Sequence, residues 1–468
     1  MAPKFGTSGL RGLVTELTEE LVADHLRAFL AACDPGTGLY VGRDLRPSSP
    51  EIAASVARAA GSAGISVTDC GAVPTPALAL AAMGAGAAAV MVTGSHIPAD
   101  RNGLKFYTPA GEITKAEEAA ILAALGTPAG AGGPGPATDS SAGPAYVARY
   151  VSAFGPQALA GQRIGLYAHS AVGRDLMAEI FAGLGAEVIE LGRSESFIPV
   201  DTEAVDPATR QQLVDWASEY RLDAVVSADG DGDRPLLADE TGRVVPGDVL
   251  GQITAAELGA ETVVTPVSSN TGAEVSGRFA RVIRTRIGSP FVIAGMGQAP
   301  GRTVGYEANG GFLLGFDAAG PAGPLPRLMT RDALLPLIAP LAAAKAAGGL
   351  AARVAQEPAR FTAADRLQET PTELSRALLG RLSDAVERAD FLAALGLSEL
   401  AVDITDGLRM TLADGRILHL RPSGNAPEFR VYAEAETPEA AADLLARGLA
   451  HVRSAVDAGP AFPGRREA

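Results

Sequence analysis

Short apolar strands that run directly into polar loops are the feature that most constrains the fold of this chain. The segment 222–228 has the pattern of a buried strand and leads into the acidic run 229–234. The segment 87–92 is a second such strand, and it ends in the polar loop 93–96. In α/β proteins, functional residues lie on loops that follow buried strands. The pattern therefore predicts α/β domains whose chemistry is placed at strand ends.

Strand and helix patterns alternate through the first part of the chain. Residues 38–42 and 65–69 have strand patterns, and residues 75–83 have a helical one. Between the two strands, Ser49 as N-cap and Pro50 as first helical residue predict the start of a helix that reaches about residue 60. This alternation is typical of α/β folds.

A segment rich in Gly, Pro, Ala, Ser and Thr at 126–143 indicates a linker and a domain boundary. A second α/β unit is expected from about residue 163 and a third from about residue 247. An Ala-rich helical stretch at 332–355, interrupted at Gly348 and Gly349, closes the third unit.

The last part of the chain mixes helix and strand. A helix is predicted from Thr370 and Pro371 to about residue 389, and alternating strand patterns follow it. This mixture predicts an α+β domain. The expected domain limits are 1–140, 141–243, 244–357 and 358–468.

Composition excludes several classes of protein. A net charge of −15 on 468 residues argues against nucleic acid or anionic membranes as partners, because both attract basic surfaces. Two cysteines, Cys33 and Cys70, suggest neither a disulfide framework nor a zinc site, which favours a cytoplasmic location. The charge-free stretch 77–93 is interrupted by glycine and is expected to be core rather than a membrane span.

The run 229–234 places Asp229, Asp231 and Asp233 at every second position with glycine between them. Oxygen ligands of this kind suit Mg²⁺, which binds one or a few carboxylates and leaves room for phosphate oxygen and water. Arg234 adds a guanidinium that can bind phosphate with two hydrogen bonds. The run predicts a site for a metal and a phosphate.

Two other interpretations of this run stay open. Together with Glu240, the three aspartates stand at positions 1, 3, 5 and 12 of an EF-hand calcium loop, but the sixth position, which requires glycine, is Arg234. A strand pattern also precedes the run, where an EF-hand has a helix. An acidic surface turn is the second alternative, since Asp and Gly are ordinary turn residues.

The remaining polar loops are ambiguous one at a time. Ser95 in Thr-Gly-Ser-His does not match the G-x-S-x-G nucleophile elbow of acyl-transfer enzymes. Glu307 is compatible with a simple turn. The segment 421–427 is more specific, because its arginine, hydroxyl, amide and backbone N–H groups make a cradle for an anion, with Arg430 nearby.

Taken together, these loops resemble the α-D-phosphohexomutase family along nearly the whole chain. The resemblance rests on the segments 5–12, 93–105, 229–234, Glu307, 403–409 and 421–427, which occur in the family's order. It implies a four-domain, heart-shaped architecture, with three similar mixed α/β domains and a smaller C-terminal α+β domain. Each domain is expected to contribute one loop to a central cleft.

The resemblance also implies a role for each loop. Ser95 would carry a phosphoryl group and, with Asp229, Asp231 and Asp233, hold one Mg²⁺. Catalysis would involve Lys105, Arg11 and His96. The substrate would be bound by Arg234, Glu307, Asn309, Arg421, Ser423, Gly424, Asn425 and Arg430.

The activity implied is the interconversion of hexose 6-phosphate and hexose 1-phosphate through a phosphoserine and a hexose 1,6-bisphosphate, which also serves as activator. Mannose and glucose phosphates are the preferred substrates, with glucosamine phosphate as the alternative. A Mg²⁺-dependent sugar-phosphate phosphatase and a non-catalytic sugar-phosphate sensor are the competing functions. The protein is expected to be a monomer or homodimer.

Three departures from the family pattern affect these assignments. Many relatives have Ala and Asn where this chain has Gly94 and Ile97. Two histidines common in relatives are replaced, one by Ser289 and the other in the sugar loop at Gly311. The general acid and base are therefore open, with Lys105, His96 and Arg11 as candidates.

Overall fold

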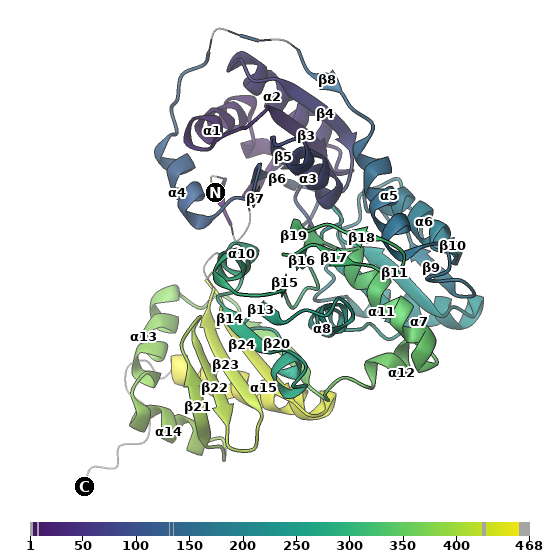
Figure 1. The fold of residues 1–468 in the computed structure, drawn as a ribbon. Helices are drawn as coiled ribbons and strands as arrows, with labels where there is room; N and C mark the ends of the chain where they lie inside the picture. Colours follow the sequence, from purple (N-terminus) through teal and green to yellow (C-terminus); the bar gives the residue numbers. More distant parts are fainter. Residues whose placement is uncertain (1–2, 7–8, 131, 134, 424–426, 458–468) are drawn as a thin grey trace. The chain divides into compact units, whose positions relative to one another are not determined.

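The computed structural model describes residues 3–6, 9–130, 132–133, 135–423 and 427–457 (Figure 1). The chain forms two compact units. The first comprises residues 1–264, 278–283 and 288–357, and the second comprises residues 265–277, 284–287 and 358–468. None of the helices in the described ranges combines the length and the apolar character that a bilayer crossing requires.

The first sheet of the first unit is mixed, in the strand order β1-β2-β6-β5-β3-β4-β8, with β7 paired to β6. Strand β3 runs parallel to β4 and β5, whereas β6 is antiparallel to β5. The strands are β1 Lys4–Phe5, β2 Leu10–Leu13, β3 Leu39–Arg43, β4 Val67–Ala72, β5 Ala88–Val92, β6 Arg101–Thr108, β7 Gly111–Glu112 and β8 Ala137–Thr138.

Helices cover both faces of this sheet. Every residue of β5 is buried, and successive side chains join two different cores, because side chains alternate across a strand. Val90 packs with the helices at 19–32 and 49–62, whereas Met91 packs with the helix at 75–84. This burial confirms that the apolar stretch at 77–93 is core. The helical segments are η1 Val14–Glu16, α1 Glu19–Ala32, α2 Ser49–Ser62, α3 Thr75–Gly84 and α4 Lys115–Ala123.

The second sheet has the order β10-β9-β11-β12, with β9 parallel to both neighbours and β11 antiparallel to β12. The acidic run 229–234 is the loop that joins β11 to β12, as the sequence pattern predicted. The elements are α5 Ala142–Phe154, β9 Arg163–Tyr167, α6 Arg174–Gly183, β10 Glu187–Leu191, α7 Pro207–Tyr220, β11 Ala224–Ala228 and β12 Pro235–Asp239.

The third sheet has the order β14-β13-β15-β16-β19, and a hairpin of β17 and β18 precedes β19. Its strands are β13 Thr262–Pro266, β14 Arg281–Thr285, β15 Thr303–Tyr306, β16 Phe312–Leu314, β17 Ala318–Ala319, β18 Pro324–Leu325 and β19 Leu328–Asp332. Its helices are α8 Gly247–Glu257, α10 Ser289–Gln298, α11 Leu335–Ala347 and α12 Leu350–Val354. Helix α9 Gly272–Val275 belongs to the second unit. The predicted interruption between α11 and α12 is present, because Gly348 and Gly349 have φ values of 86° and 135°.

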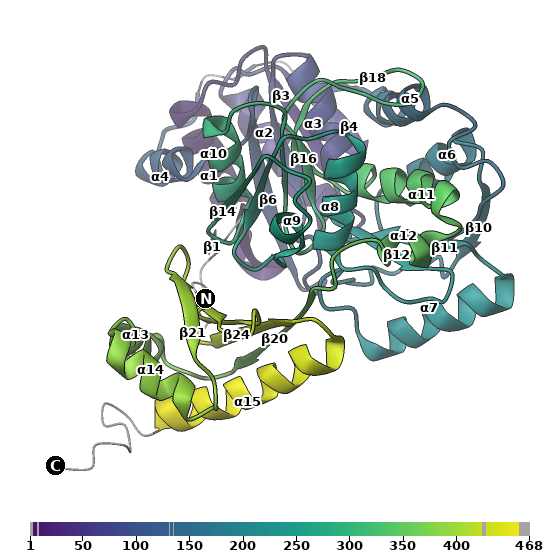
Figure 2. The same cartoon turned by 60° about the horizontal axis from the view of Figure 1, so that its bottom comes forward.

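The second unit contains an antiparallel sheet of order β20-β24-β23-β22-β21, with α15 along one face (Figure 2). Its strands are β20 Phe361–Leu367, β21 Glu399–Asp403, β22 Leu408–Leu412, β23 Ile417–Pro422 and β24 Phe429–Ala435. Its helices are α13 Thr372–Leu382, α14 Ala385–Ala393 and α15 Pro438–Asp457. The α+β character agrees with the prediction.

Two local predictions were wrong, and the structure adds a short strand to a third. The single helix expected over 370–389 is two helices, because the Asp384 side chain accepts the backbone N–H groups of Val386 and Glu387 and starts a new helix there. Ser49 is the first residue of α2 rather than its N-cap, and its hydroxyl donates to Asp44. The linker 126–143 includes β8, which pairs with β4. The domain limits 1–140, 141–243, 244–357 and 358–468 remain a proposal.

A buried carboxylate ties α5 to β19 within the first unit. The hydroxyls of Tyr146 and Tyr150 both donate to Asp332, and all three side chains are buried. Hydrogen bonds to a charged group contribute more than neutral ones, and an unsatisfied buried carboxylate is costly. This cluster therefore stabilises the position of β19, which carries Arg331 toward the acidic loop.

We predict that Tyr150→Phe lowers the free energy of unfolding by about 1.5–3 kcal/mol, because it removes one hydrogen bond to a buried charge. Urea unfolding measures the change. Tyr220→Phe, at the end of α7, is the matched control and should leave the unfolding midpoint unchanged. Equal midpoints for Tyr150→Phe and the unaltered protein would contradict the assignment.

Candidate active site

Ser95 lies in the loop after β5 in an unusual conformation. Its φ is 55°, and its side chain is fully buried. A non-glycine residue in this left-handed region costs on the order of 1–3 kcal/mol, and such strain is concentrated at functional sites. The backbone N–H of Ser95 donates to Thr93 Oγ1 at 2.8 Å, and its Oγ donates to Asp229 Oδ2 at 2.6 Å. The predicted serine and the predicted metal loop are therefore in direct contact.

Arg46 holds the serine loop in this conformation. Its guanidinium donates to four backbone carbonyls, those of Ser95 at 2.8 Å, Ile97 at 2.6 Å, Pro98 at 2.7 Å and Arg101 at 3.0 Å. Its Nε donates to Asp44 Oδ2 at 3.1 Å. Asp44 in turn accepts the hydroxyls of Ser49 and Thr93. The charge of Arg46 is thus compensated while its hydrogen bonds fix the loop.

The close packing of Arg46 explains one departure from the family pattern. A Cβ atom at position 94 would lie 2.7 Å from Arg46 Cζ, so the alanine found in many relatives would collide with the guanidinium. The ring of Phe197 lies against the same guanidinium, 4.1 Å from Cζ to the ring centroid. Gly94 therefore provides the space that Arg46 occupies.

Two glycines shape the acidic loop. Gly232 has a φ of 75°, and a Cβ on Gly230 would come within 2.8 Å of the Ser95 carbonyl oxygen. The EF-hand alternative is not supported, because a strand precedes the loop and Glu240, its twelfth position, accepts the backbone N–H of Ala351 instead. The acidic surface turn is also wrong, since all three aspartates are buried.

The three aspartates of the loop fit a divalent cation. Oxygen atoms of Asp229, Asp231 and Asp233 lie within 4.8 Å of one another. No hydrogen-bond donor in the described part of the chain reaches the buried Asp231 Oδ1 or Asp233 Oδ1. Burial, followed by the charges of the other two aspartates, raises the pKa of Asp229 to about 8. Oxygen-only ligands, two of them buried without a hydrogen-bond donor, match the requirements of Mg²⁺.

Lys105 and Arg11 approach the acidic loop from neighbouring strands. Lys105 Nζ donates to Asp231 Oδ2 at 2.6 Å and to Asp233 Oδ2 at 2.5 Å. Arg11 is opposite Gly103 in the pairing of β2 with β6, which places it on the same face as Lys105. Burial, and then the charge of Arg234, lowers the pKa of Arg11 to about 10, so it stays protonated at neutral pH.

His96 and Arg234 form a second contact beside Ser95. Arg234 Nη1 lies 3.0 Å from His96 Nδ1. Because a guanidinium only donates, Nδ1 must accept and carries no proton. Burial, and then the nearby Arg234, lowers the pKa of His96 to about 3. The imidazole is therefore neutral and oriented by Arg234.

Glu307 and Asn309 lie in the loop after β15. Both are buried, and Asn309 Oδ1 accepts the Gly311 N–H at 3.0 Å. The Asn309 carbonyl accepts the hydroxyl of Thr202 at 3.4 Å. Glu307 Oε2 lies 3.5 Å from Arg331 Nη1. The predicted sugar loop is thereby connected to the metal loop, since Arg331 also pairs with Asp233.

In the second unit, those residues of the predicted phosphate loop that the structure describes lie close together. Arg421 and Arg430 are directly opposite each other on β23 and β24, and Ser423 is buried beside them. Gly424 and Asn425 lie outside the described residues. Arg366 on β20 is opposite Arg430 and completes a row of three arginines. Like charges directly opposite repel, and carboxylates offset this repulsion here, because Arg421 pairs with Asp406 and both Arg366 and Arg430 pair with Glu428.

Three of these residues were missed by the sequence analysis. Arg46 follows strand β3, so the rule that polar loops after buried strands carry function could have identified it. Arg331 lies inside a strand and Arg366 requires strand pairing to be known, so neither leaves a local signal.

Comparison with known proteins identifies the family. Models of the phosphoglucomutase/phosphomannomutase family match in four consecutive parts: α/β/α domain I at residues 2–129, domain II at 144–242, domain III at 246–361 and the C-terminal domain at 352–451. A phosphomannomutase from Sinorhizobium fredii is 47% identical over 97% of this chain and 100% of its own length. A phosphoglucosamine mutase from Symbiobacterium thermophilum is 30% identical over 97% of this chain and 99% of its own.

Solved structures agree on the fold. A putative phosphomannomutase from Thermus thermophilus superposes with a TM-score of 0.77 at 22% identity, covering 98% of this chain and 100% of that one. The fold and site define a four-domain α/β hexose phosphate mutase. The chain belongs to the phosphoglucomutase/phosphomannomutase family.

We predict that Arg46→Lys lowers kcat about 10- to 100-fold, because an ammonium group cannot hold four carbonyls and the strained serine loop relaxes. The KM for the sugar phosphate should change less than about threefold, since Arg46 binds no substrate in this assignment. Steady-state mutase kinetics measure both. Arg58→Lys, an exposed arginine of α2 paired with Glu19, is the control and should behave as the unaltered protein. An unchanged kcat for folded Arg46→Lys would refute the role of Arg46.

Proposed function

We propose that this protein interconverts hexose 6-phosphates and hexose 1-phosphates, with mannose and glucose phosphates as substrates. The observation that carries the proposal is the 2.6 Å contact between Ser95 Oγ and Asp229 Oδ2 at the edge of a buried acidic cluster. A serine placed against a cation site is suited to carrying a phosphoryl group. Membership of the mutase family supports the same reaction.

Asp229, Asp231 and Asp233, together with the phosphorylated Ser95, would hold one Mg²⁺. When bound, the cation offsets the charge of the three carboxylates and of the phosphoryl oxygens. Lys105, Arg11 and Arg234 add positive charge around the same point. Phosphoryl transfer depends chiefly on positioning and on such charge stabilisation.

In the proposed cycle, phosphoserine at Ser95 transfers its phosphoryl group to a sugar hydroxyl and forms hexose 1,6-bisphosphate. The bisphosphate turns within the site and returns its other phosphoryl group to Ser95. Free hexose 1,6-bisphosphate activates by phosphorylating an unmodified serine. Glu307 and Asn309 would bind sugar hydroxyls.

We assign proton transfer to Lys105 among the three candidates. His96 Nδ1 is engaged by Arg234, and Arg11 stays protonated at neutral pH. Lys105 Nζ lies within hydrogen-bond distance of two aspartates next to Ser95. It would deliver a proton to the departing serine oxygen and take up the proton that the attacking sugar hydroxyl loses, so that the transfer balances.

The non-reacting phosphate would be bound in the second unit by Arg421, Ser423 and Arg430, together with Gly424 and Asn425. Guanidinium groups and a hydroxyl recognise phosphate and not ring stereochemistry, so the same cradle can accept either end of the sugar. We retain the cytoplasmic location, the monomeric or homodimeric state and the absence of nucleic-acid and membrane partners as proposals.

One observation supports the substrate preference, and a second shows that the site is compatible with any anionic sugar. The phosphomannomutase relative is more similar to this chain than the phosphoglucosamine mutase, at 47% against 30% identity. The negative charge of the chain does not oppose an anionic sugar, because arginines and a lysine line the candidate site.

We expect turnover of mannose and glucose phosphates in a coupled assay with Mg²⁺ and a trace of hexose bisphosphate, and at least about tenfold lower kcat/KM with glucosamine phosphate, a difference of about 1.4 kcal/mol in transition-state binding. Chelation of Mg²⁺ should abolish turnover. A preference for glucosamine phosphate would assign the alternative mutase activity. Release of inorganic phosphate faster than isomer formation would instead indicate a phosphatase.

We expect part of the purified protein to carry one phosphate, located at Ser95 by peptide mass mapping. Ser95→Ala should carry no adduct, since the phosphoryl acceptor is removed. Its kcat should fall at least about 10³-fold. Ser423→Ala is the control and should keep the adduct, because Ser423 is assigned to binding the non-reacting phosphate. A phosphate on another residue, or full activity of Ser95→Ala, would overturn the nucleophile assignment and favour a sensor.

A further inference from the structure

Ser289 and Gly311, two positions at which the sequence departs from the family pattern, contact the same buried ion pair. The hydroxyl of Ser289, the first residue of α10, donates to Glu112 Oε2 at 2.8 Å. At the other position, a Cβ atom on Gly311 would lie 3.0 Å from Arg331 Cδ and 3.1 Å from its Cγ. Glu112 and Arg331 are themselves paired, with Nε 3.4 Å from Oε1. The two replacements therefore accommodate one arrangement of side chains.

Arg331 connects three carboxylates that come from different parts of the first unit. Its Nη2 lies 2.9 Å from Asp233 Oδ2 in the metal loop. Its Nη1 lies 3.5 Å from Glu307 Oε2 in the sugar loop. Arg331 is 2% exposed, so these contacts are protected from solvent. One rigid guanidinium thus sets the distance between a proposed metal ligand and a proposed sugar ligand.

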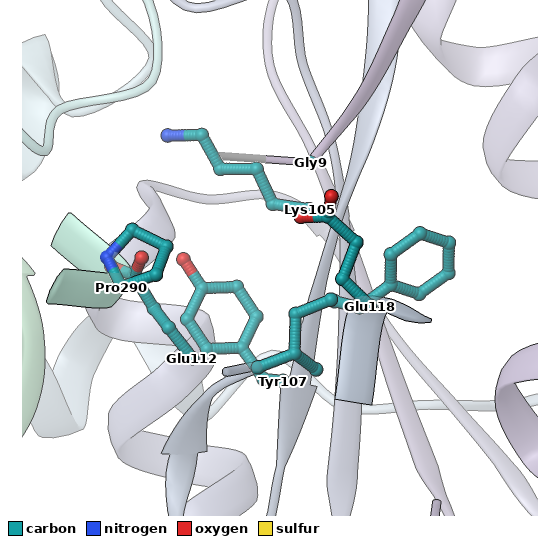
Figure 3. Close-up of a pocket in the computed structure, with 8 residues that line it drawn as sticks. Gly9, Lys105, Tyr107, Glu112, Glu118 and Pro290 are labelled. Atoms are coloured by element: carbon teal, nitrogen blue, oxygen red, sulfur yellow. The ribbon is translucent and has the colours of Figure 1, made fainter. Parts of the chain in front are cut away.

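Glu112 is itself fixed from several directions. Besides Ser289, it accepts the hydroxyl of Thr330 at 3.3 Å and the backbone N–H of Arg331 at 3.4 Å. Figure 3 shows Glu112 and Tyr107 around a small cavity, with Lys105 and Pro290 also lining it. Because Glu112 is on β7 and Ser289 begins α10, this anchor joins the first and third sheets of the first unit.

The charge of Arg331 does not vary with pH in the working range. Burial opposes the charged form, but the charges of Asp233, Glu112 and Glu307 raise the pKa of Arg331 well above its ordinary value. A guanidinium differs in this respect from an imidazole, whose unperturbed pKa is near neutrality. A buried ion pair alone is weak evidence of function. The Arg331 guanidinium, in addition, bridges the metal loop at Asp233 and the proposed sugar loop at Glu307.

We propose that Arg331 is a positioning residue for the mutase reaction, anchored by Glu112 and Ser289, and that it couples the geometry of the metal site to that of the sugar site. The proposal rests on the function proposed above. Asp233 is held in the orientation that a cation requires, and Glu307 is held in the orientation that sugar hydroxyls require. Disturbing Arg331 should therefore weaken both binding events together.

Arg331→Lys is the primary test, because lysine keeps the charge but cannot hold three carboxylates in a planar fork. Groups that orient metal ligands typically contribute 10- to 100-fold to affinity, so we expect Mg²⁺ to bind at least about tenfold more weakly, measured by calorimetry on the metal-free protein. The KM for mannose 1-phosphate should rise by about the same factor. Glu112→Gln should shift both quantities in the same direction by a smaller factor, and it remains informative if Arg331→Lys does not fold.

Arg353→Lys is the matched control. Arg353 is a buried arginine that pairs with Glu257 and Glu357, and neither carboxylate belongs to the candidate site. This variant should lower stability without changing Mg²⁺ affinity or KM. Equal changes in Arg353→Lys and Arg331→Lys would show a general stability effect and overturn the proposal.

The outcomes separate this inference from the proposed function. Failure of the unaltered protein to turn over any hexose phosphate would refute the proposed function, while the calorimetric comparison of Mg²⁺ binding would still test Arg331. Turnover by the unaltered protein, with unchanged Mg²⁺ affinity and KM in Arg331→Lys and Glu112→Gln, would refute the inference alone. A loss confined to kcat would also refute it, since the proposed coupling acts on binding.

Discussion

Three carboxylates are buried in one loop, and the rest of the first unit depends on the positive charge that they require around them. Asp229, Asp231 and Asp233 cannot stay ionised together in a low-dielectric environment unless positive charge surrounds them. Lys105 from β6 and Arg331 from β19 supply part of that charge, and a divalent cation fits the oxygen atoms that they leave unbonded. Because these cations come from distant strands, the acidic loop also organises the packing of the sheets around it.

The strained serine loop shows how local strain is compensated by distant contacts. Ser95 adopts a left-handed conformation, and the hydrogen bonds of Arg46 to the surrounding carbonyls stabilise it. Glycine at position 94 is required by this arrangement, because a methyl group would displace the guanidinium. Gly94 departs from the family pattern, and the packing of Arg46 against it accounts for this departure. The same reasoning applies to Gly311 and Arg331.

Much of the architecture was predictable because hydrophobic periodicity reports burial directly. Strands β5 and β11 were identified from apolar runs, and the residues that follow them, including Ser95 and Asp229, proved to be in contact. Errors occurred where side-chain capping decided the outcome. Asp384 divides a predicted helix in two, although nothing in the apolar pattern interrupts it there. Capping depends on a few hydrogen bonds, which periodicity does not register.

The sequence by itself determined the type of chemistry. The run of alternate aspartates with glycine, the serine loop and the anion cradle at 421–427 each consist of residues that are neighbours in the sequence, so a local pattern reveals them. Only the tertiary structure decided which charges meet. Arg331 and Glu112 are more than two hundred residues apart, and Arg46 reaches a loop about fifty residues away. Strand pairing and sheet packing bring such residues together, and no local pattern encodes those distances because the contacts depend on the fold as a whole.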